Sequence, residues 1–114
     1  MRDEALSFTI NPGDRDGLLI MKLMGPVTLS NIFPLQTELS TTAPKVLVVD
    51  MSDVPYMDSA GLGVLINYYV RAKKHGRDLL LAGVNERVDA LFTVTNTRAL
   101  LKIYPTVAAA QAVA

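Results

Sequence analysis

Three carboxylates and one serine, all within a short stretch of the chain, are the residues best suited to chemistry. Asp50, Asp53 and Asp58 could together bind a divalent cation or take part in acid–base chemistry, and Ser59 follows the last of them. Each carboxylate also has a structural explanation, because Asp50 ends a predicted strand, Asp53 lies in a turn and Asp58 caps a helix. No histidine or regularly spaced ligand joins them, so the sequence predicts no metal site.

Ser59 lacks the neighbours that a nucleophilic serine needs. A nucleophile elbow has glycine two residues before and two residues after the serine, and here Gly61 is present but Met57 takes the other place. The single histidine, His75, lies at the far end of the same predicted helix, about 24 Å away at 1.5 Å per residue. The chain also has no phosphate-binding glycine loop, since Ile66 stands where a third glycine would be needed. We therefore expect no catalytic residue; turnover that Ser59→Ala abolishes would indicate an enzyme instead.

The local sequence predicts that Ser59 is displayed at the start of a helix. With Asp58 as the N-cap, its carboxylate would accept the backbone N–H of Ala60 or Gly61, and Ser59 would hold the first helical position with its hydroxyl near the rim. Gly61 and Gly63 each cost a helix about 0.8–1.0 kcal/mol relative to alanine. Close approach of another surface would offset that cost.

A partner surface is predicted along the same helix. Gly63 lies one turn beyond Ser59 and Asn67 one turn further, which makes a low polar ridge, and Tyr56 and Met57 could flank it as apolar contacts. The simpler alternative is that Asp-Ser only begins the helix.

The remaining sequence predicts the elements that position this site. Apolar stretches at Ser7–Ile10 and Gly17–Met24 are separated by turn formers and indicate a hairpin. A β-branched run without alternation at Val46–Asp50 is typical of a central strand covered on both faces. Further strands are predicted at Leu79–Ala82 and Leu100–Tyr104.

Four helices follow from apolar spacing and from capping residues, so the order is β-β-α-β-α-β-α-β-α. This order predicts an α/β fold with a mixed, mostly parallel sheet of four to five strands, the first strand antiparallel at an edge. The first helix is capped by Thr28 or Ser30, has Pro34 in its first turn and carries the apolar residues Leu29, Ile32, Leu35 and Leu39. The second is capped by Asp58, ends at Gly76 and carries Leu62, Leu65, Ile66 and Tyr69. The third is capped by Asn85, ends at Asn96 and carries Val88, Leu91 and Phe92, and Thr106 caps an alanine-rich terminal helix.

Length and composition narrow the class of protein. The chain has 114 residues, which predicts a single domain over residues 1–114, and its formal charge is zero, which argues against nucleic acid as a partner. No apolar run approaches the roughly 20 residues that span a bilayer, so we expect no membrane insertion. The chain has no cysteine and its acidic start predicts no signal peptide, so a cytoplasmic location is expected.

The run D-x-S-x-V-x-Y-x-D-S-A-G-L-G, from Asp50 to Gly63, resembles the signature of STAS domains, specifically of bacterial anti-sigma factor antagonists. The likeness reaches almost the whole chain. It includes the N-terminal strand pair, Gly76 with the strand after it, Leu91-Phe92, Val94-Thr95-Asn96, and Ile103-Tyr104-Pro105 before the terminal helix.

This resemblance implies a partner switch in transcription regulation. The unphosphorylated domain would bind an anti-sigma factor, a serine kinase with a histidine-kinase-like ATPase fold, and so free the sigma factor. Phosphorylation of Ser59 would end binding, and a metal-dependent serine phosphatase would reset the switch. The ATP belongs to the kinase, so no cofactor is expected here. The implied docking residues beside Ser59 and Asp58 are Pro26, Thr28, Tyr56, Met57, Gly61, Gly63 and Asn67.

One segment departs from the family pattern. Switch members commonly carry Gly-Glu-Leu-Asp after the second strand, with acidic groups that meet the kinase, whereas this chain has Gly25-Pro26-Val27-Thr28. Thr28 could still cap the helix, and Pro26 is explained as a rigid turn residue. The alternative function is a phosphorylation-independent STAS subunit of a larger assembly, such as a lipid-transport complex or a stress-signalling scaffold, in which Ser59 only caps and Ser59→Ala leaves function intact.

Overall fold

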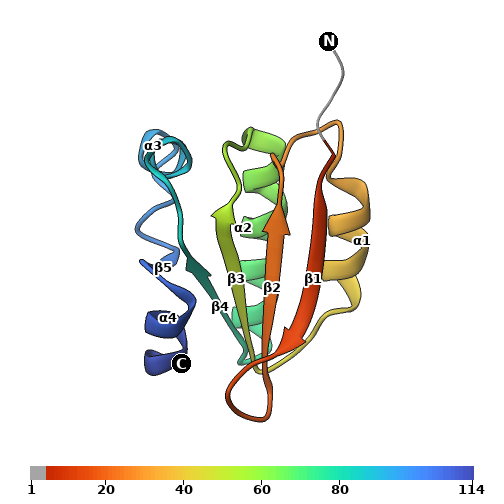
Figure 1. The fold of residues 1–114 in the computed structure, drawn as a ribbon, viewed down its shortest axis with the longest axis vertical. Helices are drawn as coiled ribbons and strands as arrows, with labels where there is room; N and C mark the ends of the chain where they lie inside the picture. The colour runs from red at the N-terminus through yellow and green to blue at the C-terminus, as the bar shows by residue number, and fades with distance from the viewer. Residues whose placement is uncertain (1–4) are drawn as a thin grey trace.

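A five-stranded mixed sheet forms the centre of the computed structural model, which describes residues 5–114 (Figure 1). Residues 1–4, part of the start on which the signal-peptide prediction rests, lie outside the described residues. The strands lie in the order of the chain: β1 (Ser7–Pro12), β2 (Leu18–Met24), β3 (Val46–Asp53), β4 (Asp78–Ala82) and β5 (Lys102–Tyr104). The β1 strand pairs antiparallel with β2 and all other pairs are parallel, which confirms the predicted hairpin, central strand and antiparallel edge.

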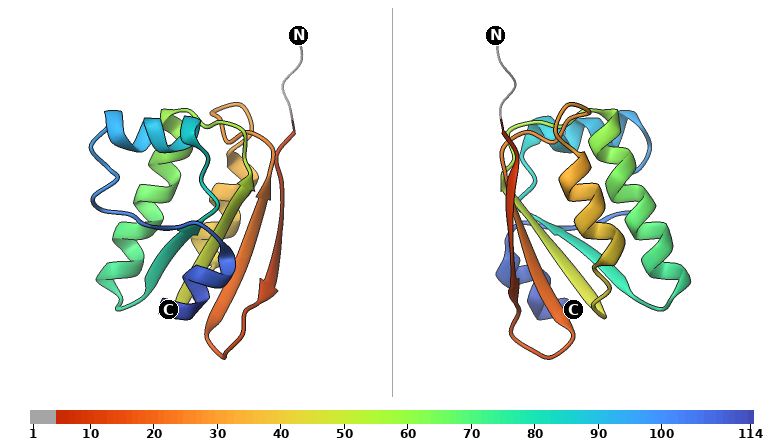
Figure 2. Two further views of the ribbon diagram at one scale, coloured as in Figure 1. Left: turned by 60° about the vertical axis from the view of Figure 1, so that its left-hand side comes forward. Right: turned by 90° about the vertical axis from the view of Figure 1, so that its right-hand side faces the viewer.

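Helices cover both faces of the sheet. The first two, α1 (Phe33–Thr41) and α2 (Ser59–Lys74), lie on one face, α4 (Val107–Val113) lies on the other, and α3 (Glu86–Val94) lies near one end of the sheet (Figure 2). The larger core lies beneath α1 and α2 and includes Met21, Leu47 and Val49 of the sheet. A smaller core packs under α4 around Val48 and Ala110, so β3 is buried on both faces, as its sequence predicts. Within residues 5–114, every helix is too short or too polar to cross a bilayer.

The predicted start of α1 is wrong. The helix begins at Phe33, and neither Thr28 nor Ser30 caps it; Ile32 holds the N-cap position without a side-chain hydrogen bond. Pro34 does lie in the first turn, as predicted. Proline is favoured there because its missing N–H would have no intrahelical partner.

A local turn takes the place of the missing first turn of α1. The Asn31 side-chain oxygen accepts the backbone N–H of Thr28 at 2.9 Å, and the Asn31 amide donates to the Pro26 carbonyl at 2.9 Å. Asparagine side chains compete with helix formation in this way. Leu29, predicted on the apolar side of the helix, is consequently 61% exposed, whereas Leu35 and Leu39 are buried as expected.

The apolar stripe of α2 differs from the prediction at one place. Leu62 and Leu65 are buried as predicted, but Ile66 and Tyr69 are only partly buried, and Tyr68 is the aromatic residue in the core. The Tyr68 hydroxyl donates a hydrogen bond to the carbonyl of Thr42 at 3.1 Å. Spacing by threes from Leu62 through Leu65 leads to Tyr68, which is why this face, and not the one carrying Tyr69, meets α1 and the sheet.

Burial of Tyr68 predicts a loss of stability at alkaline pH. Burial raises the pKa of the Tyr68 hydroxyl above its ordinary value of 10.0, although Arg77 and Arg71 nearby oppose the shift. The stabilisation that this tyrosine gives is fully present below pH 10 and is lost as the pH rises through the folded-state pKa. In Tyr68→Phe, which lacks this titration, we expect unfolding free energy about 1 kcal/mol below wild type at pH 8, for the lost hydrogen bond.

Urea unfolding of both proteins between pH 8 and pH 11 checks this expectation. The difference between wild type and Tyr68→Phe should shrink as the pH rises above 10. A difference that stays constant over that range would contradict the assigned burial effect.

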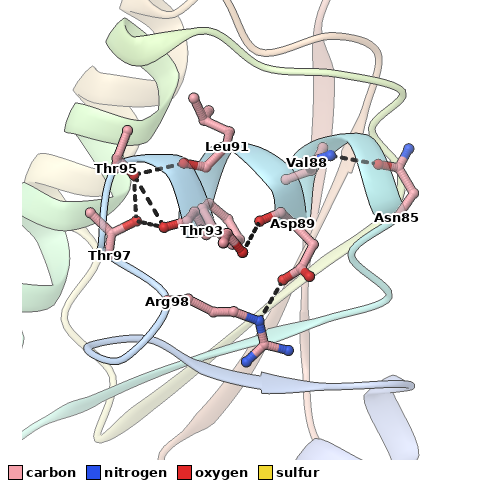
Figure 3. A network of polar contacts seen from close by, with 9 residues as sticks. Asn85, Val88, Asp89, Leu91, Thr93, Thr95, Thr97 and Arg98 are labelled. Carbon is pink, nitrogen blue, oxygen red and sulfur yellow. Dashed lines mark hydrogen bonds and ion pairs between the residues drawn. The ribbon is translucent and has the colours of Figure 1, made fainter.

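Capping side chains define both later helices as predicted. Asn85 accepts the backbone N–H of Val88 at 2.8 Å to start α3, and Thr106 accepts that of Ala109 at 3.0 Å to start α4. Beyond the end of α3, Asn96 adopts a left-handed conformation with φ of 59°. Arg98 then turns back to Asp89, with 2.8 Å between Nε and Oδ1, and so ties the outgoing chain to the helix (Figure 3).

Candidate functional site

Asp58 uses both carboxylate oxygens to hold the start of α2. It adopts an extended conformation as N-cap, and Oδ1 accepts the backbone N–H of Gly61 at 3.0 Å, one of the two predicted bonds. Oδ2 accepts the backbone N–H of Leu29 at 3.0 Å, and the Asp58 N–H donates to the Val27 carbonyl at 3.1 Å. Asp58 therefore caps α2 and also ties the segment between β2 and α1 to it.

Ser59 is the first residue of α2 and its side chain is exposed. Within residues 5–114, no group forms a hydrogen bond with its hydroxyl. The backbone N–H groups of Ser59 and Ala60 belong to the first helical turn, which has no intrahelical acceptors for them. The hydroxyl thus stands in solvent at the positive end of a helix macrodipole.

The structure requires a glycine at position 61 but not at position 63. A Cβ atom on Gly61 would lie 2.6 Å from the Val27 carbonyl oxygen and 2.8 Å from Val27 Cγ1, so the close approach that requires this glycine is made by the chain itself. Gly61, predicted as a partner contact, is buried against Val27 of the same chain. A Cβ atom on Gly63 would meet nothing within 4 Å, so Gly63 leaves the ridge low.

Two other predicted contact residues also lie below the surface. Met57 is 8% exposed and forms a parallel bridge with Val27, and Pro26 is buried beside it. Both support the segment between β2 and α1 and do not line the outer surface. Thr28 and Tyr56 are partly buried, and the guanidinium of Arg87 lies 4.8 Å from the centre of the Tyr56 ring.

The exposed part of the site is a helix face that continues away from Ser59. Gly63 and Asn67 follow Ser59 at intervals of four residues, and Asn67 is exposed. Asn67 lines a groove of about 220 Å³ between α1 and α2, together with Gln36 and Ser40 of α1. The ridge predicted from the sequence therefore ends in a groove between the two helices.

Sequence reasoning missed two apolar residues at this site. Leu29 and Phe33 are 61% and 63% exposed, and both come from the segment that Asp58 holds. The predicted helix begins too early, and this places Leu29 wrongly on a buried helix face. Pro34 was the available signal, since a proline in the first turn places the helix start at Phe33.

The three carboxylates do not act together. Asp50 accepts the backbone N–H of Ser52 at 3.0 Å, and Asp53 forms an ion pair with Lys22 at 3.3 Å. Asp58 serves as the cap. No group of three or more acidic or histidine side chains in residues 5–114 is arranged to hold a metal ion.

Removing the Asp58 carboxylate is expected to lower the free energy of unfolding. Asp58→Ala should cost about 1–2 kcal/mol, the usual effect of losing an N-cap. Asp58→Asn is the matched control, because its single amide oxygen can replace only one of the two acceptors, so its loss should be smaller. Urea unfolding measures both. Wild-type stability in Asp58→Ala would contradict the capping and tethering roles.

The STAS domain family model matches residues 9–110. An anti-sigma-B factor antagonist from Bacillus subtilis is 39% identical over 57 residues, which cover 50% of this chain and 52% of that protein. The counterpart in Listeria monocytogenes is 34% identical over 58 residues, 51% of each chain. The chain thus spans about half the length of these curated relatives.

Solved structures share the fold. An anti-sigma factor antagonist from Mycobacterium paratuberculosis has a TM-score of 0.82 at 20% identity, over 95% of this chain and 92% of that one. A sulfate transporter family protein from Wolinella succinogenes has a TM-score of 0.75 at 26% identity, over 84% of this chain and 83% of that one.

Proposed function

The chain belongs to the STAS domain family, and from this premise we propose that it is an anti-sigma factor antagonist that acts by partner switching. The unphosphorylated form binds an anti-sigma factor serine kinase, which releases the sigma factor. Phosphorylation of Ser59 ends that binding. The observation that carries the proposal is the exposed Ser59 hydroxyl at the first position of α2, beside the Asp58 cap.

The fold tolerates a phosphoryl group on Ser59. A phosphate at a helix start meets free backbone N–H groups and the positive end of the macrodipole, which both favour an anion. No side chain has to move aside, because the hydroxyl is in solvent. Asp58 keeps its two backbone partners at Gly61 and Leu29, so the cap remains in place.

The same phosphate opposes binding of a partner over Ser59. It adds a charge of about −1.5 to −2 and would have to lose its hydration in a closed interface. The Asp58 carboxylate is the adjacent charge and has the same sign. Unless the partner supplies a cation, the phosphorylated form should therefore dissociate.

The chemistry of the switch belongs to its partners. The kinase transfers the terminal phosphoryl group of ATP to Ser59 Oγ and releases ADP and a proton. A metal-dependent serine phosphatase transfers that group to water, which yields inorganic phosphate and restores the hydroxyl. This chain supplies the acceptor and the docking surface, and it needs neither a cofactor nor a catalytic residue.

Phosphorylation is tested with each anti-sigma factor kinase encoded in the same genome. We expect one of them, with ATP, to add the mass of one phosphoryl group to the wild-type protein. Ser59→Ala should gain no mass, whereas Ser30→Ala, which removes another exposed hydroxyl, should gain it as wild type does. Intact-mass spectrometry makes the measurement. Equal phosphorylation of Ser59→Ala would place the site elsewhere and contradict the proposal.

A second candidate function is a phosphorylation-independent STAS subunit of a larger assembly. It is favoured by the Gly25-Pro26-Val27-Thr28 segment, which lacks the acidic residues of the switch pattern, and by the similar fold of a transporter family protein. In that case Ser59→Ala would keep full function and no kinase would modify the chain.

A further inference from the structure

The two segments that form the surface around Ser59 carry no charged residue. No Asp, Glu, Lys or Arg occurs between Pro26 and Thr37, or between Ser59 and Val70, although 19% of the chain is charged. The first segment leads into α1, and the second forms most of α2. Three charged residues adjoin these segments: Asp58, Glu38 and Arg71. Both carboxylate oxygens of Asp58 accept backbone N–H groups, and the Arg71 guanidinium donates to the Leu39 carbonyl.

Two large apolar side chains are exposed on this surface. Leu29 and Phe33 are 61% and 63% exposed, and among residues 5–114 Phe33 is the only aromatic residue with a largely exposed side chain. Leu29 is fixed next to Ser59, because its N–H donates to Asp58 Oδ2 at 3.0 Å. Exposed aromatic and aliphatic side chains on a rigid support are typical binding anchors.

Phe33 and Ser59 lie on the two helices that form the groove, Phe33 about one turn before Gln36 on α1 and Ser59 two turns before Asn67 on α2. Along α1, Gln36 and Ser40 follow Phe33 at helical spacing and line one wall of the groove. Along α2, Gly63 and Asn67 follow Ser59 in the same way, and Asn67 lines the other wall. Arg71 lines the same wall one turn further on, and its guanidinium donates to the Leu39 carbonyl. The two helices pack side by side on one face of the sheet (Figure 2).

We infer that this chain recognises its partner through an uncharged surface with an apolar centre, formed by Leu29, Phe33, Gln36, Ser59, Gly63 and Asn67. The occupant is an equally uncharged, apolar patch of the anti-sigma factor kinase, since the two charges nearest this surface already have partners within the chain. Asp58 accepts two backbone N–H groups, and Arg71 donates to the Leu39 carbonyl. This inference rests on the proposed function and specifies its partner. Affinity then comes from burial of Phe33 and Leu29, and it depends little on salt.

The same property makes the surface sensitive to phosphorylation. A phosphate placed at Ser59 in such an interface meets apolar side chains and neutral amides in place of cations. Its hydration is lost without compensation, so one modification is sufficient to end binding.

The test uses the kinase that phosphorylates Ser59 in the mass experiment. Phe33→Ala should weaken its binding about tenfold or more, and Leu29→Ala several-fold, as expected of interface anchors. Val113→Ala is the matched control, because Val113 is 60% exposed but lies on α4, on the opposite face of the sheet, and should bind as wild type does. Raising sodium chloride from about 0.05 to 0.5 M should change the Kd less than about threefold.

The possible failures are distinct. If no kinase binds the wild-type chain, the proposed function fails and this inference fails with it. If wild type binds, but Phe33→Ala and Leu29→Ala bind equally well or salt weakens binding more than tenfold, only the inference is wrong. Sedimentation in the absence of the kinase completes the test: a dimer that Phe33→Ala dissociates would assign the surface to a second copy of this chain and overturn the inference. Circular dichroism of each variant verifies that it is folded.

Discussion

Gly61→Ala is expected to lower the free energy of unfolding by about 1–3 kcal/mol, the usual cost of overpacking, whereas Gly63→Ala should raise it by about 0.8–1.0 kcal/mol. Alanine improves helix propensity equally at both positions. At Gly61, however, the new methyl group would lie 2.6 Å from the Val27 carbonyl oxygen. At Gly63 it would enter open space.

The Val27 backbone has little freedom to move away. Its carbonyl accepts the Asp58 N–H at 3.1 Å, and its own N–H donates to the Tyr56 carbonyl at 3.1 Å. A displacement large enough to admit a methyl group would break this pairing between the β2–α1 segment and the residues before α2. The cost at Gly61 should therefore exceed the gain in propensity.

Urea unfolding of wild type and the two variants makes the comparison. Because both substitutions are glycine to alanine in one helix, their difference isolates the contact with Val27. An equal increase in stability for both variants would show that Gly61 is not in close contact with the neighbouring segment, and the described packing would be contradicted.

Ser59→Asp should weaken binding of the anti-sigma factor kinase about 100-fold, which corresponds to about 2.8 kcal/mol, and should leave the fold intact. The charge would be buried in an interface that offers it no cation, next to the Asp58 carboxylate. In the free protein the same charge lies at a helix start, where it is favourable by roughly 0.3–1 kcal/mol. The unfolding free energy should consequently stay equal or rise slightly.

Ser59→Asn is the control for size and shape, because it matches aspartate without the charge. We expect Ser59→Asn and Ser59→Ala to bind within a few-fold of wild type. Isothermal titration calorimetry against the kinase gives the affinities. Equal loss in Ser59→Asn and Ser59→Asp would indicate a steric effect, and the electrostatic explanation would be wrong.

Local features of the fold could be predicted from the sequence because they depend on neighbouring residues. Asn85, Thr106 and Asp58 each cap a helix by accepting an N–H three residues ahead. The buried strand at β3 follows from a continuous apolar run, and its central place follows from the alternation of strands and helices. Ser59 follows Asp58 directly, so its display at the helix start was also a local property.

Features that depend on contacts between distant segments could not be predicted. The Asp58 carboxylate reaches Leu29, and Val27 forms a bridge with Met57, across about thirty residues of chain. These contacts explain why Gly61 and Met57 are buried and why Leu29 is exposed. The sequence correctly indicated that a close approach requires a glycine, but it could not show that the approaching surface belongs to the same chain.

The central claim, that phosphorylation of Ser59 dissociates the partner while the domain stays folded, is tested most directly on the modified protein itself. The kinase-treated chain is purified, its mass verified, and its affinity for the kinase and its unfolding free energy are measured before and after treatment with a metal-dependent serine phosphatase. We predict that the phosphorylated form binds at least about 100-fold more weakly at unchanged stability, and that dephosphorylation restores binding. Equal affinity of the two forms, or loss of binding that accompanies unfolding, would contradict the account.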